Sequence, residues 1–195
     1  MQTVTNFSDL DLTKEFTYTD YLSWQFSDRV ELIKGFIRKM SPVPNRKHQT
    51  ISQRLNFKIY SFFQNHPCNV YVAPFDVILP IKSAKKDTTV IQPDICVICD
   101  DSKLTDAGCN GAPDLIVEIL SAQNSKHDVD TKFKLYEESG VKEYWIVEPT
   151  QKLVLVYMLQ NEKYIGLKPF SEGEFIESPL FSYMKIAVDD VFYKV

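Results

Sequence analysis

The stretch Asp114-Leu-Ile-Val-Glu-Ile-Leu120 is a nearly continuous apolar run that a single acidic residue, Glu118, interrupts. A run of this length, entered from Gly111-Ala-Pro113, is typical of a strand buried on both faces of a sheet. An ionised carboxylate inside such a strand costs free energy unless it is paired or ligates a cation. Glu118 is therefore the first candidate functional residue.

Helix and strand patterns alternate on both sides of this strand. Upstream, the patterns predict in chain order a short helix, a hairpin, a long helix and two strands, at 18–25, 30–40, 46–65, 69–79 and 93–99. Downstream, they predict a helix, a strand and further short strands, at 126–139, 143–147 and 153–195. The order αβββαβ indicates one α/β domain over residues 1–195. Its mixed central sheet is expected to be flanked by helices, with an extra N-terminal hairpin and C-terminal strands.

The composition of the 195-residue chain is that of an ordinary globular protein. Apolar residues make up 44%, and 26 acidic against 22 basic residues give a formal charge of −4. These values exclude a disordered, collagenous or coiled-coil chain. The acidic excess argues against a protein that coats nucleic acid, which would carry a basic stripe. The basic residues are concentrated, however, at Arg38-Lys39, Arg46-Lys47-His48 and Lys82 with Lys85-Lys86, so contact with DNA is not excluded.

The first residues lack the pattern of a secretory signal, and no stretch approaches the roughly 20 apolar residues that span a bilayer. We therefore expect a cytoplasmic protein with no membrane partner. Cys96 and Cys99 form a CxxC pair, for which a zinc or redox site is one interpretation. They lie in an apolar run, and Cys68 and Cys109 stand apart from them. Buried reduced thiols are therefore the favoured expectation for the four cysteines.

A second acidic residue, Asp94, follows Pro93 at the beginning of the strand predicted over 93–99. If this strand is a neighbour of the strand that contains Glu118, both carboxylates can point to one opening. Two carboxylates, completed by waters and a substrate phosphate, commonly hold Mg²⁺ in proteins. The sequence therefore makes Asp94 and Glu118 candidate metal ligands.

Lys132 and Glu31 are two further charged residues that stand against the apolar pattern. Lys132 lies on or beside the apolar stripe of the helix predicted over 126–139. Its ammonium group either reaches solvent or pairs with a buried carboxylate such as Glu118. Glu31, within Val30-Glu-Leu-Ile33, is either an exposed strand residue or another acidic group of the same site.

His48 lies in the first turn of the helix predicted over 46–65, where free backbone N–H groups could meet a phosphate. The alternative is an ordinary solvated helix start. The chain has no GxSxG, Walker, GxGxxG or HExxH motif. Ser121 is the serine near the carboxylates, and no histidine has the position of its base. A serine hydrolase is therefore not expected.

These residues fall into an ordered series of motifs: Gln92-Pro-Asp94, Gly111-Ala-Pro-Asp-Leu-Ile-Val-Glu118-Ile-Leu-Ser121, Asp128-Val-Asp-Thr-Lys132-Phe-Lys-Leu-Tyr136 and Gly140-Val-Lys-Glu-Tyr-Trp-Ile-Val147. The series resembles the Uma-type restriction endonuclease family, formerly a domain of unknown function, in the PD-(D/E)XK nuclease superfamily. Glu31-Leu-Ile-x-Gly35, Met40-Ser-Pro42 and His48 also look like the N-terminal signature of that family. The similarity covers residues 18–170.

The resemblance implies a restriction-endonuclease-like core and a metal-dependent endonuclease that hydrolyses phosphodiester bonds in nucleic acid, with double-stranded DNA as the expected substrate. It makes Asp94 and Glu118 the ligands of Mg²⁺, or of Mn²⁺ in its place. It makes Lys132 the catalytic lysine and Glu31 an additional catalytic acid. In the superfamily the lysine lies two residues after the glutamate, where this chain has Leu120. Lys132 must therefore reach the site from the following helix.

Three more residues have expected supporting positions. Asp128 and Tyr136 each lie four residues from Lys132 and are expected to support it, and His48 is expected to face a phosphate. A homodimer is expected because two active sites cut both strands of a duplex most easily. Aromatic residues near the C-terminus are a candidate dimer interface, although packing in the core explains them equally well: Phe181, Tyr183, Phe192 and Tyr193.

Two other interpretations remain open. The chain is either a catalytically silent relative that only binds nucleic acid or a protein partner, or a structural domain in which Glu118 and Lys132 form an ion pair. The charged residues Glu31, Asp94, Glu118 and Lys132 favour the enzyme, because a binding module has no reason to retain buried charges.

Overall fold

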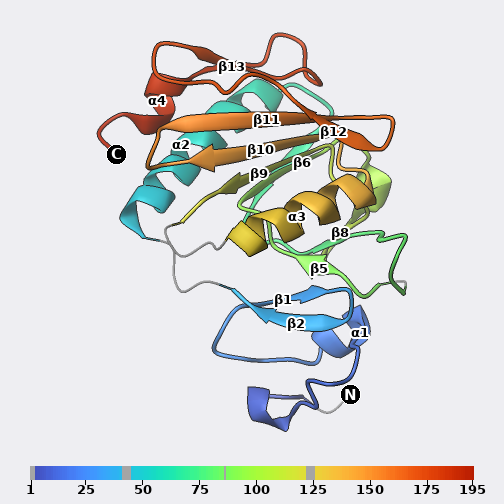
Figure 1. Cartoon of the computed structure of the whole chain (residues 1–195). Coiled ribbons are helices and arrows are strands. Elements are labelled where there is room, and N and C mark those ends of the chain that lie inside the picture. Colours follow the sequence, from blue (N-terminus) through green and yellow to red (C-terminus); the bar gives the residue numbers. More distant parts are fainter. Residues whose placement is uncertain (1–2, 41–44, 86, 122–125) are drawn as a thin grey trace.

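Two six-stranded mixed sheets and the helices that flank them make up a mixed α/β fold (Figure 1). The computed structural model describes residues 3–40, 45–85, 87–121 and 126–195. The N-terminal hairpin lies at one end of the molecule and the C-terminal segment at the other (Figure 1).

The main sheet has the strand order β12-β11-β10-β9-β6-β3. Its strands are β3 (Asn69–Val72), β6 (Ile95–Ile98), β9 (Leu115–Ile119), β10 (Glu143–Glu148), β11 (Leu153–Gln160) and β12 (Lys163–Gly166). β9 and β10 are parallel, and the other neighbouring pairs are antiparallel. The apolar runs predicted as buried strands are confirmed, since every residue of β6 and β9 is buried.

The second sheet has the order β2-β1-β5-β4-β8-β7. Its strands are β1 (Val30–Ile33), β2 (Phe36–Lys39), β4 (Val77–Ile78), β5 (Val90–Ile91), β7 (Leu104–Thr105) and β8 (Gly108–Asn110). The predicted N-terminal hairpin is confirmed as β1 and β2. Lys34 and Gly35 turn it with φ of 51° and 87°, the pair of positive values that a tight hairpin turn requires.

Helices cover both faces of the main sheet. α2 (Arg46–Phe63) lies behind it and α3 (Lys126–Ser139) in front in Figure 1. α2 begins where the Asn45 side chain accepts a hydrogen bond from the backbone N–H of His48, and it buries Ile51, Leu55 and Ile59. The smaller elements are α1 (Tyr18–Tyr21), α4 (Val188–Phe192), β13 (Phe175–Glu177), β14 (Lys185–Ala187), and the 3₁₀ turns Phe7–Asp9 and Asp101–Lys103. None of the described helices is both long and apolar enough to cross a membrane.

The two faces of the main sheet contribute to different hydrophobic clusters. On the α2 face, Val117 and Trp145 pack with α2 and the C-terminal segment. On the α3 face, Ile116 and Ile146 pack with α3 and with residues of the second sheet. Glu118 has the strand parity of Ile116, so its side chain belongs to the α3 face. This packing brings Glu118 close to both α3 and the second sheet.

The strand predicted over 69–79 is wrong as a single element. Its two parts form β3 in the main sheet and β4 in the second sheet, and Pro74 lies between them. Proline cannot donate to a strand ladder, so it favours a break at this point. The helix expected over 18–25 is shorter, and β5, β7 and β8 were not expected. These three strands have two or three residues each, too few to show a pattern in the sequence.

The expectation of four reduced cysteines is also wrong. Cys68 and Cys99 form a disulfide, while Cys96 and Cys109 are free and buried. The register pairs Asn69 with Ile98, so Cys68, just before β3, and Cys99, just after β6, lie opposite each other at the next position. Cys96 and Cys99 contribute to different hydrophobic clusters on opposite faces of the sheet. The CxxC pair therefore does not form a common site.

The C-terminal aromatic residues divide between core and surface. Phe181 and Phe192 are buried in the cluster on the α2 face, so packing explains them. Tyr183 and Tyr193 are 93% and 61% exposed. The predicted dimer interface therefore retains two of its four aromatic residues as surface groups.

Candidate active site

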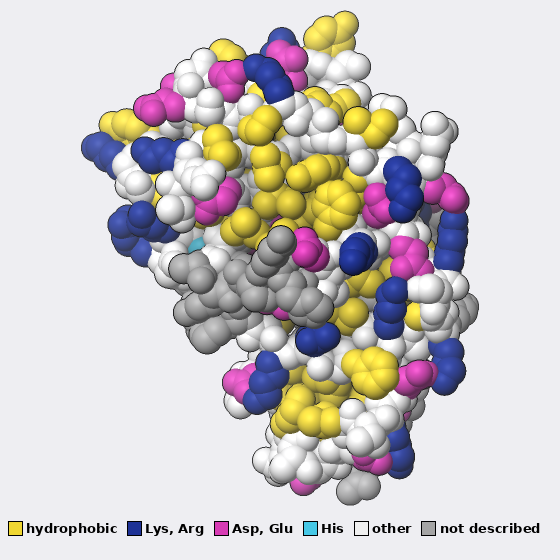
Figure 2. Space-filling view, in the orientation of Figure 1, with side chains coloured by type: hydrophobic (Ala, Val, Ile, Leu, Met, Phe, Trp, Pro, Cys, Tyr) yellow, Lys and Arg dark blue, Asp and Glu magenta, His cyan; other side chains and the backbone are white. Residues whose placement is uncertain are grey.

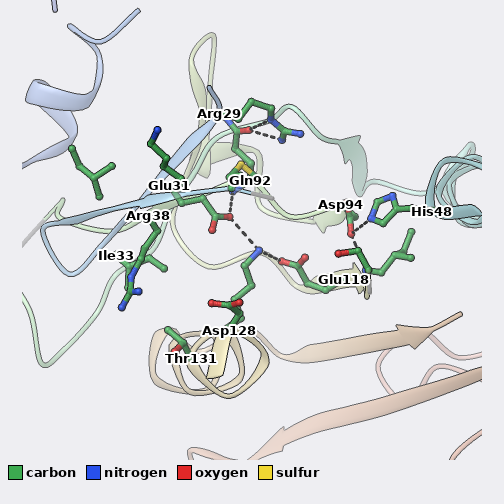
Figure 3. A pocket seen from close by; sticks show the side chains of 16 residues that line it. Arg29, Glu31, Ile33, Arg38, His48, Gln92, Asp94, Glu118, Asp128 and Thr131 are labelled. Carbon is green, nitrogen blue, oxygen red and sulfur yellow. Dashed lines mark hydrogen bonds and ion pairs between the residues drawn. The ribbon is translucent and has the colours of Figure 1, made fainter. Parts of the chain in front are cut away.

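Asp94 and Glu118 meet across neighbouring strands. β6 and β9 are antiparallel, and Ile95 pairs with Val117, which places Asp94 directly opposite Glu118 in the register. Asp94 lies just after β5, where the chain passes from the second sheet to the main sheet. Both side chains line a pocket of about 430 Å³ (Figure 3). The expected neighbourhood of the two strands is confirmed.

Lys132 reaches this pocket from α3. Its Nζ lies 2.8 Å from Oε1 of Glu118 and 3.2 Å from Oε1 of Glu31 (Figure 3). Glu31, on β1, is 5% exposed, so the interpretation of an exposed strand residue is wrong. Of the two interpretations of Lys132, pairing with a buried carboxylate is confirmed. Lys132 therefore reaches the carboxylates from the helix that follows β9.

Two uncharged donors hold the same pair of carboxylates. The hydroxyl of Tyr136, fully buried on α3, donates to Oε1 of Glu118 at 2.5 Å. The backbone N–H of Gln92 donates to Oε1 of Glu31 at 3.1 Å. Each carboxylate is therefore fixed by Lys132 and by one neutral group.

His48 lies against Asp94. Its Nε2 is 3.2 Å from Oδ2 of Asp94, which also accepts the backbone N–H of Ile119 at 2.8 Å. His48 is buried, and its Nδ1 has no hydrogen-bond partner among the described residues. A solvated helix start is therefore wrong for this residue. Burial alone would lower the pKa of His48, but the hydrogen bond to Asp94 and the negative charge of Asp94 outweigh it and raise the pKa.

The innermost charged groups of the site are three carboxylates, those of Glu31, Asp94 and Glu118, and the ammonium group of Lys132. The pKa of Glu118 is raised to about 7: burial raises it most, the charges of Asp94 and Glu31 also raise it, and Lys132 acts to lower it. Burial acts to lower the pKa of Lys132, but Glu118 and Glu31 outweigh burial and raise it. Three carboxylates thus surround one firmly protonated ammonium group.

This donor set fits a hard divalent cation. Carboxylate oxygens are the ligands that Mg²⁺ prefers, and a cation would offset the excess negative charge around Glu118. The hydrogen bonds described above reach one oxygen of each carboxylate, Oδ2 of Asp94 and Oε1 of Glu118. Within the described ranges, no three His, Cys, Asp or Glu side chains are grouped closely enough to hold a metal ion by themselves. Waters and substrate oxygens would have to complete the coordination of a cation held by Asp94 and Glu118.

Other residues surround the opening of the pocket. Figure 3 shows Glu31 and Arg38 from the N-terminal hairpin, and Asp128 and Thr131 from α3. Asp128 is exposed and lines the pocket with Lys132.

Sequence reasoning missed Arg29 and the role of Gln92. Nε and Nη2 of Arg29 donate to Oε1 of Gln92 at 3.0 and 2.6 Å, and Nε2 of Gln92 donates to Oδ1 of Asp76 at 2.7 Å. The position of Gln92 next to Pro93-Asp94 was the one sequence signal that pointed to it. The contacts that Gln92 makes depend on the fold and could not be read from the sequence.

The fold and the pocket define a mixed α/β protein with a site lined by carboxylates. Carboxylates from the two sheets meet a lysine from α3 beside β6 and β9, two inner strands of the main sheet. The chain belongs to the Uma2 family, which is described as "Putative restriction endonuclease" and which residues 18–189 match. The match confirms the resemblance and extends past its expected end at residue 170.

A solved structure has the same fold. It is described as a "putative nuclease belonging to DUF820" from Anabaena variabilis, and it is 20% identical to this chain with a TM-score of 0.72. The alignment covers 91% of this chain and 97% of the other. No curated protein matches the sequence. Family membership supports nuclease function, and the structural similarity shows that the fold is shared.

Proposed function

We propose that this protein is a metal-dependent endonuclease that hydrolyses phosphodiester bonds in DNA. One observation carries the proposal: Asp94 and Glu118 lie opposite each other on β6 and β9, and Lys132 contacts Glu118 and Glu31 in the same pocket. Nucleases that use a divalent cation need carboxylates to hold it and a positive group near the scissile phosphate.

Asp94 and Glu118 would hold Mg²⁺, or Mn²⁺ in its place. When bound, the cation would polarise the scissile phosphate and make a nearby water a stronger acid. His48 and the N–H of Ile119 hold Asp94 by hydrogen bonds, and Tyr136 holds Glu118. These contacts fix the two carboxylates before a substrate arrives, which avoids the cost of ordering them during the reaction.

Lys132 and Glu31 would act on the phosphate and on water. The raised pKa of Lys132 keeps its ammonium group protonated, so it can stabilise negative charge that develops on the phosphate. Glu31 accepts a hydrogen bond from the backbone N–H of Gln92 and contacts Lys132, a position from which it would orient a water or assist a second cation. The family to which the chain belongs makes a divalent cation the expected cofactor.

The substrate would approach the opening of the pocket, where Arg29 and Arg38 provide positive charge. Double-stranded DNA is the substrate we propose, and a homodimer would place two such sites on the two strands. Because the whole chain is acidic, binding outside the pocket is expected to be weak and sensitive to salt.

A plasmid-nicking assay with Mg²⁺ or Mn²⁺ tests the proposal. Asp94→Asn removes a cation ligand but keeps the size of the side chain, and we expect it to lower cleavage by about 10³-fold. Asp100→Asn is a matched control, because Asp100 is an exposed aspartate at the other end of β6. It should cleave like the wild type, and a chelator should abolish cleavage by both.

Equal cleavage by wild type and Asp94→Asn, or no cleavage by any variant with either cation, would contradict the enzyme. In that case, Mn²⁺ binding measured by calorimetry separates the alternatives. A structural domain held by the Glu118–Lys132 ion pair should bind no Mn²⁺ in the pocket. A catalytically silent protein that only binds nucleic acid should still bind DNA.

A further inference from the structure

A second cavity, of about 520 Å³, adjoins the candidate active site. Both cavities are lined by Arg29, His48 and Asp94, so a nucleic acid strand can extend from one cavity into the other. The wall of the second cavity is fixed to the catalytic strand, because the backbone N–H of Ala73 donates to the carbonyl of Asp94 at 3.1 Å. A group held there would lie next to the scissile phosphate.

One wall of this cavity is a polar stripe of α2. Arg46, Gln49, Gln53 and Asn56 recur at spacings of three, four and three, which places them on one side of the helix. That side is distinct from the buried stripe of α2 that packs on the main sheet. Lys and Arg side chains lie at the left edge of Figure 2, near the beginning of α2 and near the C-terminus of the chain. Arg29 and Arg46 give the cavity lining positive charge, and Arg46 is the first residue of the helix that carries the amides.

Part of the cavity lining is apolar. This part is formed by Val72, Ala73 and Pro74, and Val72 is 40% exposed although it is a β-branched apolar residue. A cavity lined by apolar groups and by a row of amides is suited to a flat group with apolar faces and polar edges. Nucleobases have this chemistry, since their edges carry both donors and acceptors and their faces are apolar. Asn and Gln side chains can donate and accept at once, so they match such edges.

We propose that the second cavity receives a nucleobase of the cleaved strand, next to the scissile phosphate, and that Gln49, Gln53 and Asn56 determine base preference there. The proposal rests on the nuclease function proposed above. Arg29 and Arg46 would contact the flanking phosphates, which position the strand without reading its sequence. A base of the proposed duplex substrate enters the cavity only when it is unstacked, so a duplex with an unpaired base beside the cut should bind better than a fully paired one.

The test uses the full-length protein and a pool of random single-stranded oligonucleotides. Cleavage with Mn²⁺ and sequencing of the product ends should show a base preference beside the cut for the wild type. Gln53→Ala/Asn56→Ala should flatten that preference and raise KM by about tenfold. Gln64→Ala/Asn65→Ala is the matched control, because Gln64 and Asn65 are exposed amides beyond the other end of the same helix. It should keep the wild-type preference and KM.

Fluorescence anisotropy with a labelled oligonucleotide and Ca²⁺ gives a second measurement, which does not depend on cleavage. The Gln53/Asn56 variant should bind about tenfold more weakly than the wild type and the control. If the wild type cleaves but the two variants share its preference, KM and affinity, the cavity proposal is overturned and the nuclease stands. If the wild type cleaves nothing, the nuclease fails, and anisotropy alone decides whether the cavity binds a nucleic acid strand. A loss of affinity confined to Gln53→Ala/Asn56→Ala supports it, and equal binding by all variants overturns it.

Discussion

Two buried glutamates, Glu118 and Glu143, lie on neighbouring parallel strands of the same sheet and have different surroundings. Glu143 begins β10 and is 0% exposed, on the face that packs against α2. It accepts hydrogen bonds from Nε1 of Trp145 at 2.6 Å, Oγ of Ser178 at 2.9 Å and the N–H of Leu180 at 2.8 Å. Glu118, on the opposite face, contacts Lys132 and lines an open pocket.

The difference separates a structural carboxylate from a candidate catalytic one. Burial raises the pKa of both glutamates, so burial alone does not distinguish them. At Glu143 the neutral donors from Leu180, Trp145 and Ser178 act to lower the pKa, and they connect the C-terminal segment to the sheet. At Glu118 two more carboxylates and an ammonium group share the space. Excess negative charge beside an opening, rather than a buried acid as such, indicates chemistry.

The largest expected effect comes from removing the ammonium group at Glu118. Lys132→Met should lower DNA cleavage by about 10³-fold, because the negative charge that develops on the phosphate loses the ammonium group proposed to stabilise it. The variant also leaves Glu31 and Glu118 without a buried counter-charge, which should lower the free energy of unfolding by about 3 kcal/mol. Cleavage rates and urea denaturation at the same pH measure the two effects.

Lys185→Met is the matched control for this prediction. Lys185 pairs with Glu177 at 2.6 Å, and the two side chains are 57% and 56% exposed. An exposed pair contributes about 0–1 kcal/mol, so this variant should remain active and nearly as stable as the wild type. Full activity of Lys132→Met would exclude the proposed role of the lysine and leave only the ion pair.

The other glutamate should show the opposite result. Glu143→Ala strands three hydrogen-bond donors in the core, and we expect it to lower the free energy of unfolding by about 3 kcal/mol. Cleavage per folded molecule should remain near that of the wild type, because Glu143 lies on the other face of the sheet from the pocket. Denaturation curves with activity measured on the folded fraction check both statements. A stable but inactive variant would show that the two faces are not independent.

Much of the main sheet could be predicted from the sequence, and less of the second sheet could. β6, β9 and β10 are apolar runs long enough to be seen, and a charge within them, such as Glu118, stands out. The short strands β5 and β8 have no such pattern, because pairing with distant segments fixes them. The bond between Cys68 and Cys99 likewise depends on strand pairing across 31 residues.

Within the candidate site, the predictable residues were those whose charge contradicts their surroundings. Asp94, Glu118 and Lys132 belong to this group. Gln92 could not be found in this way, because its contribution to Glu31 comes from a backbone N–H that every non-proline residue carries. Glu143 shows the converse limit. Its acidic side chain stands at the first position of a strand, where an exposed acid is ordinary.

The smallest effects come from single hydrogen bonds to each glutamate. Tyr136→Phe removes the donor to Glu118 and Ser178→Ala removes one donor to Glu143. Each should lower the free energy of unfolding by about 1 kcal/mol, since a single hydrogen bond of this kind contributes about that much. Only Tyr136→Phe should slow cleavage, by about tenfold, because it releases a proposed cation ligand from its fixed position. The free energy of unfolding and kcat of the two variants test the comparison between Glu118 and Glu143. Equal losses of stability with a loss of kcat in Tyr136→Phe alone support the comparison. An unchanged kcat in both variants would show that Tyr136 has only the structural role that Ser178 has.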